Sequence, residues 1–360
     1  MTTTTAISTP AQPTTRQKLT LPSSQTELAG WSAAIEDKFK LIPHAAADSL
    51  IVQQGTRQWQ LGLQHDTATS TTRIEHWYGP AQSTRQIGLV LDQVLAHTQA
   101  DHLQILDQVL TEVPALNLPH WQPEAGGRSI SRAAFYQLRE IWLSPVLNAV
   151  APDIRVSREG VIAPVPVRPQ IPDGIIYQRQ IPALNEVFTL RKATLAEDGE
   201  RFHRWQNEPR IAEYWEYPFS REKLDAYLQE RRDDAHCEPL IASFDGQPFG
   251  YIETYWCQED RLGPYYDVRP FDHGFHVLVG EVAFLGGGRS IHWVNAVSHF
   301  LFLLDPRTDR LAGEPRADNQ KLLKLLEPTA WYKEREFDFP HKRAALLKCD
   351  RETFFTTTVL

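Results

Sequence analysis

Short stretches of alternating apolar and polar residues dominate the first third of the chain. Three of them are bounded by turn-forming residues and predict strands at residues 50–52, 59–63 and 73–77. Residues 87–97 instead repeat apolar side chains at spacings of three and four, as one face of a helix does. We interpret 102–110 and 132–143 as helices too. The pattern predicts a small α/β domain.

The second half predicts strands and helices in the order β-α-α-β-β-β-α-β-α-β-β, which describes a mixed α/β sheet. At its centre we expect a strand at 276–284, three glycines, and an apolar helix at 289–304. Asp245-Gly246 predicts a hairpin turn between two neighbouring strands. The other expected helices are 197–206, one capped by Ser220, and 319–326. The other expected strands are 187–190, 240–244, 249–256, 310–314, 333–339 and 343–349.

Two stretches fit neither pattern. Residues 1–28 are rich in Thr, Ser and Pro and carry no acid before Glu27, which predicts a disordered tail. Closely spaced prolines in residues 151–185 disfavour both helix and interior strand, which predicts a linker. A chain of 360 residues is long for one domain. We therefore expect an N-terminal α/β domain at 29–150 and a larger α/β domain at 186–360.

Charge and cysteine content narrow the functional classes. The formal net charge is −8 and no run of Lys and Arg offers a track for phosphates, so a nucleic-acid partner is not expected. A membrane span is not expected either, because no apolar stretch of about 18 residues occurs. The three cysteines form no C-x-x-C pair, so neither a disulfide framework nor a cysteine-based metal site is indicated. A cytoplasmic location fits this composition.

The glycine-rich turn is the first candidate for chemistry. Gly286, Gly287 and Gly288 allow a tight turn, and the helix after them begins with free N–H groups and a positive dipole end. Such a helix start suits a pyrophosphate, with Arg289 and Ser290 as further donors. The spacing matches neither the nucleotide-binding P-loop nor the dinucleotide fingerprint. A plain surface loop capping a helix remains the alternative on spacing alone.

Six separated blocks in the second half follow one another in a fixed order: HVLVGE at 276–281, the glycine-rich turn, DP at 305–306, GEPR at 313–316, Asn319, and FPHK at 339–342. This series resembles the GNAT-superfamily acyltransferases of hydroxamate siderophore biosynthesis. The segment from Phe202 to Glu216 looks like their first helix. The likeness spans about residues 186–350, and the N-terminal half is similar to the longer members only loosely.

The resemblance implies the fold and the ligands. It implies a GNAT fold for 186–360 and a degenerate, non-catalytic GNAT-like domain for 29–150. An acyl-CoA, acetyl first and succinyl next, would serve as co-substrate, and no metal is needed. The acceptor would be an N-hydroxylated amine such as N6-hydroxylysine, N5-hydroxyornithine or an N-hydroxydiamine. The residues implied for acyl-CoA are Gly286, Gly287, Gly288, Arg289 and Ser290 at the pyrophosphate and Asn319 near the pantetheine arm, with Lys342 and Arg343 as candidates for the 3′-phosphate.

The resemblance also implies a catalytic pair. His276 matches the family's catalytic histidine, and an imidazole with an ordinary pKa near 6.5 suits the modest task of a base for a hydroxylamine. Glu314, or else Asp318, would be the second acid, and backbone N–H groups of the splayed central strand would bind the oxyanion. Alternation along one strand places Glu253 and Tyr255 on the same face, where they would bind the substrate or simply pack.

Two other functions stay open. A GNAT enzyme for another small amine, an antibiotic or a protein N-terminus would prefer an unhydroxylated amine. A non-catalytic CoA-binding partner protein would show no turnover. Expected partners are a small hydroxylamine or amine, with other siderophore-pathway enzymes and a second copy of the chain left open.

Overall fold

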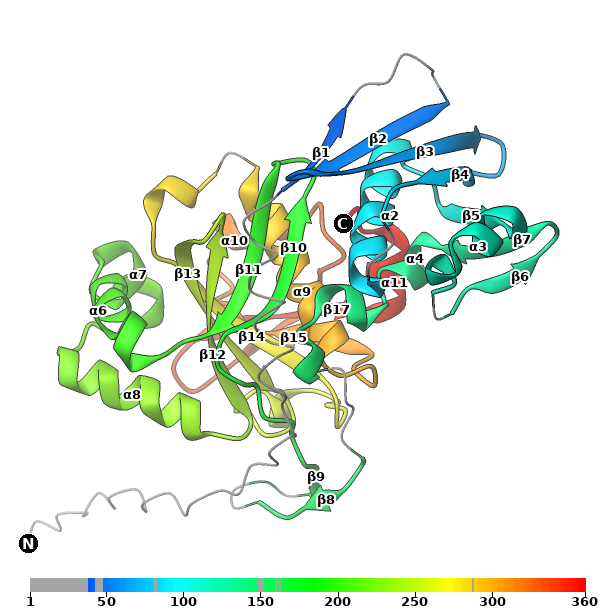
Figure 1. Ribbon diagram of the computed structural model, residues 1–360. Coiled ribbons are helices and arrows are strands. Elements are labelled where there is room, and N and C mark those ends of the chain that lie inside the picture. The colour runs from blue at the N-terminus through cyan, green and yellow to red at the C-terminus, as the bar shows by residue number, and fades with distance from the viewer. Residues whose placement is uncertain are drawn as a thin grey trace, which may run out of the picture.

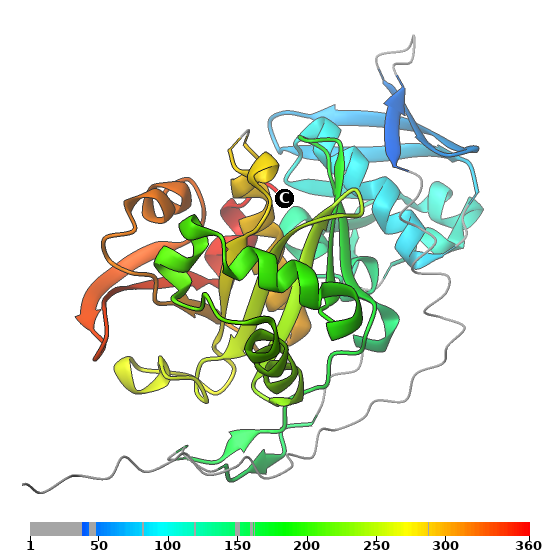
Figure 2. The ribbon, with the colours of Figure 1, turned by 90° about the vertical axis from the view of Figure 1, so that its left-hand side faces the viewer.

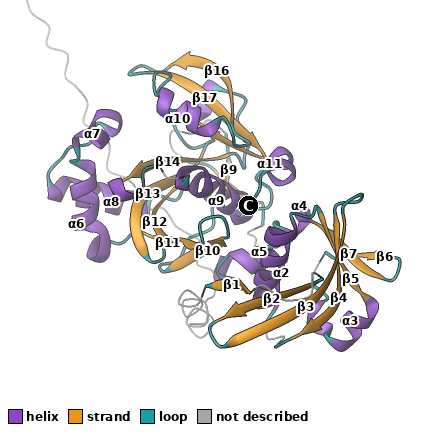
Figure 3. Cartoon of the chain, turned by 90° about the horizontal axis from the view of Figure 1, so that it is seen from above, coloured by secondary structure: helices purple, strands orange, loops and turns teal. Residues whose placement is uncertain are grey.

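The computed structural model describes residues 38–42, 48–80, 83–118, 120–147, 152–158, 161, 163–286 and 288–360. The segment expected as a tail, 1–28, lies outside these residues. Two sheets, one from each half of the chain, lie side by side with helices packed between them (Figures 1 and 3). No helix of the described residues is both long and apolar enough to cross a membrane.

The first sheet has seven strands in the order β1-β2-β3-β4-β5-β7-β6. All neighbours are antiparallel except β4 and β5, and the chain passes between these two through helix α2 (Thr84–Thr98), whose N-cap is Ser83. The strands are β1 (Phe39–Ile42), β2 (Ser49–Gln54), β3 (Arg57–Asp66), β4 (Thr71–Tyr78), β5 (His102–Leu106), β6 (Gln122–Glu124) and β7 (Gly127–Ser131). The expected strands and the helix at 87–97 are confirmed.

Two helix predictions in this half are wrong. Residues 102–106 form strand β5, because Leu103 and Ile105 turn into the core while the strand pairs with β4 and β7. A helix begins only afterwards, as α3 (Asp107–Glu112). Residues 132–143 form two short helices instead of one. The remaining short elements are α4 (Arg132–Phe135), α5 (Arg139–Trp142), η2 (Pro114–Leu116) and η3 (Pro145–Leu147).

The proline-rich segment is only partly a linker. Strands β8 (Arg155–Val156) and β9 (Val165–Pro166) pair with each other as a separate two-stranded sheet. Strand β10 (Ile175–Ile181) then forms the edge of the second large sheet by pairing with the next strand. The sheet of the second half therefore starts within the range 151–185 expected as a linker.

The second sheet has eight strands in the order β10-β11-β12-β13-β14-β15-β17-β16. Its only parallel neighbours among the described residues are β14 and β15, and they share a single register pair, His273 with Leu311. The two strands therefore splay apart after that pair. The strands after β10 are β11 (Glu186–Lys192), β12 (Cys237–Phe244), β13 (Gln247–Trp256), β14 (His273–Val279), β15 (Arg310–Gly313), β16 (Tyr332–Asp338) and β17 (Arg343–Asp350).

The central strand differs from its expected bounds of 276–284. Strand β14 ends at Val279 because the N–H groups of Gly280 and Glu281 both donate to the Phe249 carbonyl, which turns the chain away from the ladder. The Trp205 ring lies so close to the Gly280 Cα that no side chain fits there. A short 3₁₀ turn, η5 (Val282–Phe284), follows.

Helices cover both faces of this sheet. Figure 2 shows α6 (Leu195–Gln206), α7 (Pro209–Trp215) and α8 (Arg221–Asp233) in front of the strands. Helix α9 (Arg289–Leu304) lies on the opposite face, where its apolar residues are buried. The last helices are α10 (Gln320–Leu326) and α11 (Arg351–Thr357), and η4 (Gly263–Tyr265) lies between β13 and β14. The expected bounds of α9 and the Ser220 N-cap of α8 are confirmed.

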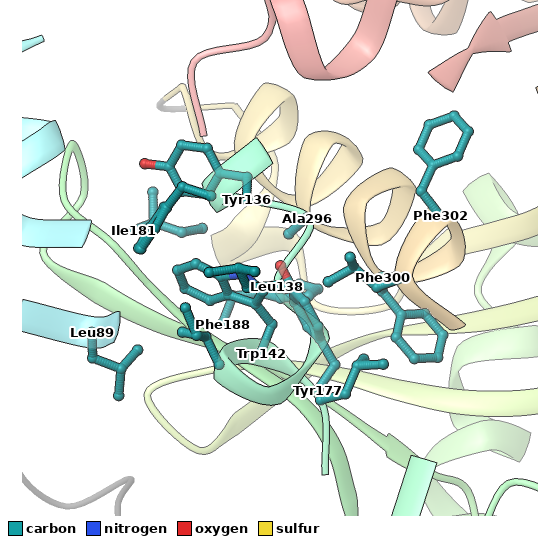
Figure 4. Packing of buried hydrophobic residues seen from close by; sticks show 14 of the residues in the cluster. Leu89, Tyr136, Leu138, Trp142, Tyr177, Ile181, Phe188, Ala296, Phe300 and Phe302 are labelled. Atoms are coloured by element: carbon teal, nitrogen blue, oxygen red, sulfur yellow. The ribbon is translucent and has the colours of Figure 1, made fainter. Parts of the chain in front are cut away.

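The two halves share one hydrophobic core. Figure 4 shows Tyr136 and Trp142 from the first half against Tyr177 on β10 and Phe300 on α9. Polar contacts reinforce the junction, because Arg139 donates from Nε to the Leu303 carbonyl at 2.7 Å and from Nη2 to the Leu304 carbonyl at 3.2 Å. These carbonyls end helix α9 and have no partner within the helix. The first half therefore supports the helix that lies behind the central strand.

The two large sheets have a common plan. In each, two parallel neighbours flank a helix, β4 and β5 with α2 and β14 and β15 with α9. In each, the strand after the helix pairs next with the second strand of a later hairpin. This shared arrangement supports the prediction that the first half is a GNAT-like domain.

Candidate active site

Three neighbouring strands bring the candidate catalytic residues together. His276 lies on β14 directly opposite Glu253 on β13 in the antiparallel register. Glu314 follows the last residue of β15, on the other side of β14. The positions are 23 and 38 residues apart along the chain, so only the sheet brings them together. Of the two acids expected beside His276, Glu314 is the one that contacts it, while Asp318 is exposed and pairs with Arg316.

Both ring nitrogens of His276 face carboxylates. Nδ1 lies 3.3 Å from Oε1 of Glu253, and Nε2 lies 3.1 Å from Oε1 of Glu314. An ionised carboxylate only accepts hydrogen bonds, so a ring that bonds to both must donate from both nitrogens. This geometry favours the doubly protonated imidazolium form.

The electrostatics point the same way. Burial lowers the pKa of His276, but the charges of Glu314 and Glu253 outweigh it and raise the pKa to about 10. The expected pKa near 6.5 is therefore wrong. Burial would raise the pKa of Glu314, yet the charge of His276 holds it below its usual range, and the pKa of Glu253 is lowered against burial by the same partner. At neutral pH the site holds one cation between two anions.

Tyrosines hold the two carboxylates in place. Tyr227 on α8 and Tyr251 on β13 donate to Oε2 of Glu253 at 2.6 and 2.9 Å. Tyr255 donates to Oε2 of Glu314 at 2.7 Å, and its ring lies 4.7 Å from the His276 ring. Glu253 and Tyr255 do share a face, as predicted, but their polar groups bind neighbouring side chains. Their predicted substrate contact stays a prediction, and their contacts in the structure position His276.

Two further cations lie within 4 Å of the Glu314 carboxylate. Arg261, in the loop between β13 and β14, places Nη2 3.3 Å from Oε1 of Glu314. Lys342, in the turn between β16 and β17, places Nζ 3.8 Å from the same oxygen and donates to the Glu314 carbonyl at 2.7 Å. Sequence reasoning considered Lys342 only for a phosphate and missed Arg261 and Tyr227. No local pattern marks them, because each comes from a different loop or helix.

The glycine-rich turn lies at the N-terminus of α9, as predicted. Gly286 and Gly288 both have φ near 78°, in the left-handed region, and a Cβ at either would meet open space. Gly288 is the N-cap of α9 and offers no side-chain cap, while the Arg289 N–H donates to the Gly286 carbonyl at 3.2 Å. Gly287 lies outside the described residues.

The other residues expected at acyl-CoA have partners of their own. Arg289 makes a bidentate ion pair with Glu186, at 3.0 and 2.7 Å. The Asn319 side chain caps α10 by accepting from the Leu322 N–H at 3.2 Å. The Ser290 side chain is half-buried in the first turn of α9. Their roles at the pyrophosphate and pantetheine stay predictions.

Helix α7 lies along the splayed edge of β14. Trp215 donates from Nε1 to the Val277 carbonyl at 3.1 Å, and Arg210 donates to the Val279 carbonyl at 2.7 Å. A strand residue points its N–H and C=O to the same edge, so the N–H groups of Val277 and Val279 face the gap that β15 leaves. The structure therefore offers backbone donors within one or a few residues of His276, where an oxyanion would need them.

The chain is similar in sequence to known acyltransferases. Residues 194–339 match the sequence profile of a family described as acetyltransferase (GNAT) domain. The chain is 42% identical over 227 residues to the N(6)-hydroxylysine O-acetyltransferase of Escherichia coli, which covers 63% of this chain and 71% of that protein. It is 40% identical over 194 residues to the N(5)-hydroxyornithine:cis-anhydromevalonyl coenzyme A-N(5)-transacylase SIDF of Beauveria bassiana, covering 53% and 43%. A crystal structure of an aminoglycoside acetyltransferase in complex with coenzyme A is similar over 47% of this chain and 98% of that one, with 24% identity and a TM-score of 0.43.

Proposed function

Because this chain belongs to the GNAT acyltransferase family, we propose that it transfers an acyl group from acyl-CoA to the nitrogen of an N-hydroxylated amine. The product is a hydroxamate, the iron(III)-binding group of hydroxamate siderophores. The relative from Escherichia coli is named for N(6)-hydroxylysine and the one from Beauveria bassiana for N(5)-hydroxyornithine. Both names support a hydroxylated amino acid as the acceptor.

The observation that carries this proposal is the position of His276 between two carboxylates, which favours its imidazolium form. With both nitrogens bound to carboxylates and its pKa raised to about 10, the imidazolium cannot take a proton from an alkyl ammonium at neutral pH. A plain lysine amine, with a pKa near ~10.4, would arrive charged and unreactive. A hydroxylamine is far less basic and arrives neutral. The site is therefore matched to a nucleophile that needs no base before it attacks.

The same proton can serve the second half of the reaction. Attack by the neutral nitrogen forms a C–N bond, and collapse of the tetrahedral intermediate breaks the C–S bond and releases a thiolate. The imidazolium of His276 gives its proton to this sulfur, and the resulting neutral imidazole takes the proton that the newly acylated nitrogen must lose. One proton thus moves from nitrogen to sulfur in total, and Glu314 and Glu253 restore the imidazolium as the resting state.

The donor is proposed as acetyl-CoA, with succinyl-CoA next. The N-terminus of α9, which no side chain caps, supports a pyrophosphate there, because the positive end of the helix dipole favours an anion. Gly286, Gly287, Arg289, Ser290 and Asn319 complete the proposed cofactor-binding set.

The test compares N6-hydroxylysine with lysine as acceptor, using acetyl-CoA and thiol release to follow turnover. At pH 7 only about one lysine side chain in a few thousand is uncharged, so kcat/KM for N6-hydroxylysine should exceed that for lysine by about 10³. The excess should shrink about tenfold per pH unit towards pH 10. Faster turnover of lysine at pH 7 would show that the acceptor is a plain amine.

The product decides between nitrogen and oxygen acylation. A hydroxamate forms a coloured iron(III) complex, whereas an O-acyl hydroxylamine does not, so absorbance after adding iron(III) together with the product mass separates them. We expect the coloured complex.

His276→Gln should lower kcat at least tenfold and leave the dissociation constant of CoA unchanged. His102→Gln, at an exposed histidine, serves as the matched control. Absence of turnover with every acyl donor would favour a non-catalytic CoA-binding protein.

A further inference from the structure

We propose that Arg261 and Lys342 recognise the carboxylate of the acceptor, so that the enzyme selects a hydroxylated amino acid over an N-hydroxydiamine. This inference rests on the function proposed above and adds the residues that select the acceptor by its carboxylate. Arg261 reaches Glu314 from the loop between β13 and β14, and Lys342 reaches it from the turn between β16 and β17.

The first support is an excess of positive charge around one oxygen. Oε1 of Glu314 has three cationic nitrogens within 4 Å, namely Nε2 of His276 at 3.1 Å, Nη2 of Arg261 at 3.3 Å and Nζ of Lys342 at 3.8 Å. Glu253 is the second carboxylate of the cluster, and its Oε1 lies 3.3 Å from Nδ1 on the other side of the imidazole. Among the groups in direct contact, three cations therefore face two carboxylates.

The other acids nearby make no described ion pair with these two cations. Asp260 precedes Arg261, but its carboxylate accepts from the Leu262 N–H at 2.9 Å and makes no described ion pair with Arg261 or Lys342. Asp318 and Glu216 are exposed and both pair with Arg316, at 2.8 and 3.8 Å. Neither makes a described ion pair with Arg261 or Lys342.

The second support is that both cations are held in place by one aromatic ring. The Arg261 guanidinium lies 5.8 Å and the Lys342 ammonium 5.4 Å from the centre of the Phe339 ring. Phe339 itself is buried and packs on Tyr265, with ring centres 4.4 Å apart. Such cation–π contacts restrain long side chains, so less conformational entropy is lost when a ligand binds.

The third support is that Arg261 has donors to spare. Half of its side chain (51%) is exposed, and its single described hydrogen bond uses only one of the five N–H groups of the guanidinium. The fork geometry of the remaining groups matches a carboxylate in a bidentate arrangement. Lys342 adds a point charge next to it, with 15% of its side chain exposed.

The distance to the reacting nitrogen also fits. Arg261 and His276 contact the same oxygen of Glu314, so the guanidinium lies within two hydrogen-bond lengths of the imidazole. The hydroxylated nitrogen and the carboxyl carbon of N6-hydroxylysine are six bonds apart, roughly 7 Å when extended. An acceptor that places its nitrogen beside His276 can therefore place its carboxylate at Arg261. N-hydroxycadaverine has the same chain but no carboxylate.

The experiment measures kcat/KM for N6-hydroxylysine and N-hydroxycadaverine with acetyl-CoA held saturating. We expect the wild type to prefer N6-hydroxylysine by at least about 30-fold. Arg261→Gln and Lys342→Gln should each lower this preference, by about 10- to 100-fold for the arginine, as expected for loss of a charge-assisted hydrogen bond. The change should appear mainly as a higher KM for N6-hydroxylysine. Arg261→Lys should keep an intermediate preference.

Lys333→Gln is the matched control, because Lys333 lies on β16 and pairs with Glu336 instead of Glu314. Its preference should equal that of the wild type. Equal turnover of both acceptors by the wild type, or an unchanged preference in Arg261→Gln, overturns the inference. A higher KM for acetyl-CoA with an unchanged preference also overturns it, because the cations would then bind the donor. Turnover of neither hydroxylamine by a folded wild type refutes the proposed function itself.

Discussion

Removing the charge of Glu314 tests the central electrostatic argument. In Glu314→Gln the side chain keeps its size and can still accept from Tyr255, but the anion 3.1 Å from Nε2 of His276 is gone. At an effective dielectric constant of about 20, unit charges at that separation attract by about 5 kcal/mol, and burial of the ring offsets part of this. A neighbouring opposite charge usually shifts a pKa by about 1 to 3 units. The pKa of His276 should fall from about 10 to between roughly 7 and 9.

The direction of the activity change follows from which form is active. The imidazolium donates the proton, so activity is present below the pKa of His276 and is lost as pH rises through it. In the wild type, kcat/KM for the hydroxylamine should stay flat up to about pH 9. In Glu314→Gln the decline should begin about 1 to 3 pH units lower. Glu253→Gln should shift the profile in the same direction, because Glu253 also raises the pKa of His276.

Two measurements check this prediction. An NMR titration of the His276 ring, assigned by its absence in His276→Gln, gives the pKa directly, and pH–rate profiles give the kinetic counterpart. The exposed Glu352→Gln on α11 is the control and should leave both unchanged. Circular dichroism confirms that Glu314→Gln is folded. A wild-type His276 that titrates near 6.5, or a pKa unmoved by Glu314→Gln, would refute the imidazolium argument.

Three further variants test the supports of the site. Tyr227→Phe removes the 2.6 Å hydrogen bond to Glu253 and should lower kcat several-fold and stability by about 1 kcal/mol, with CoA affinity unchanged in calorimetry. Gly280→Ala forces a methyl group into the Trp205 ring at the end of β14. Thermal melting should show a free energy of unfolding lower by about 1–3 kcal/mol, and turnover should fall. A variant as stable as the wild type would contradict this packing. Arg139→Met removes the hydrogen bonds from Arg139 to the Leu303 and Leu304 carbonyls at the end of α9, so denaturant unfolding should show a free energy of unfolding about 2 kcal/mol lower. An unaltered free energy of unfolding would mean that these hydrogen bonds do not stabilise the junction.

Local signals in the sequence were enough for most elements of the second half. The bounds of α9 follow from a glycine before it and unbroken apolar periodicity within it, and Ser220 caps α8 because its hydroxyl reaches the Lys223 N–H. The hairpin at Asp245-Gly246 has both residues at positive φ, as that dipeptide predicts. The prediction for residues 102–106 was wrong because a stretch as short as His-Leu-Gln-Ile-Leu fits a helix or a strand, and pairing with β4 decides it.

For the site, the sequence by itself determined the residues that resemble a known family, His276 and Glu314, and the glycine-rich start of α9. Only the tertiary structure decided that His276 lies between two carboxylates, that Glu253 and Tyr255 position it, and that Arg261 and Lys342 gather at the same acid. The physical reason is that a pKa depends on charges within a few ångströms, and here those charges come from strands and loops far apart along the chain.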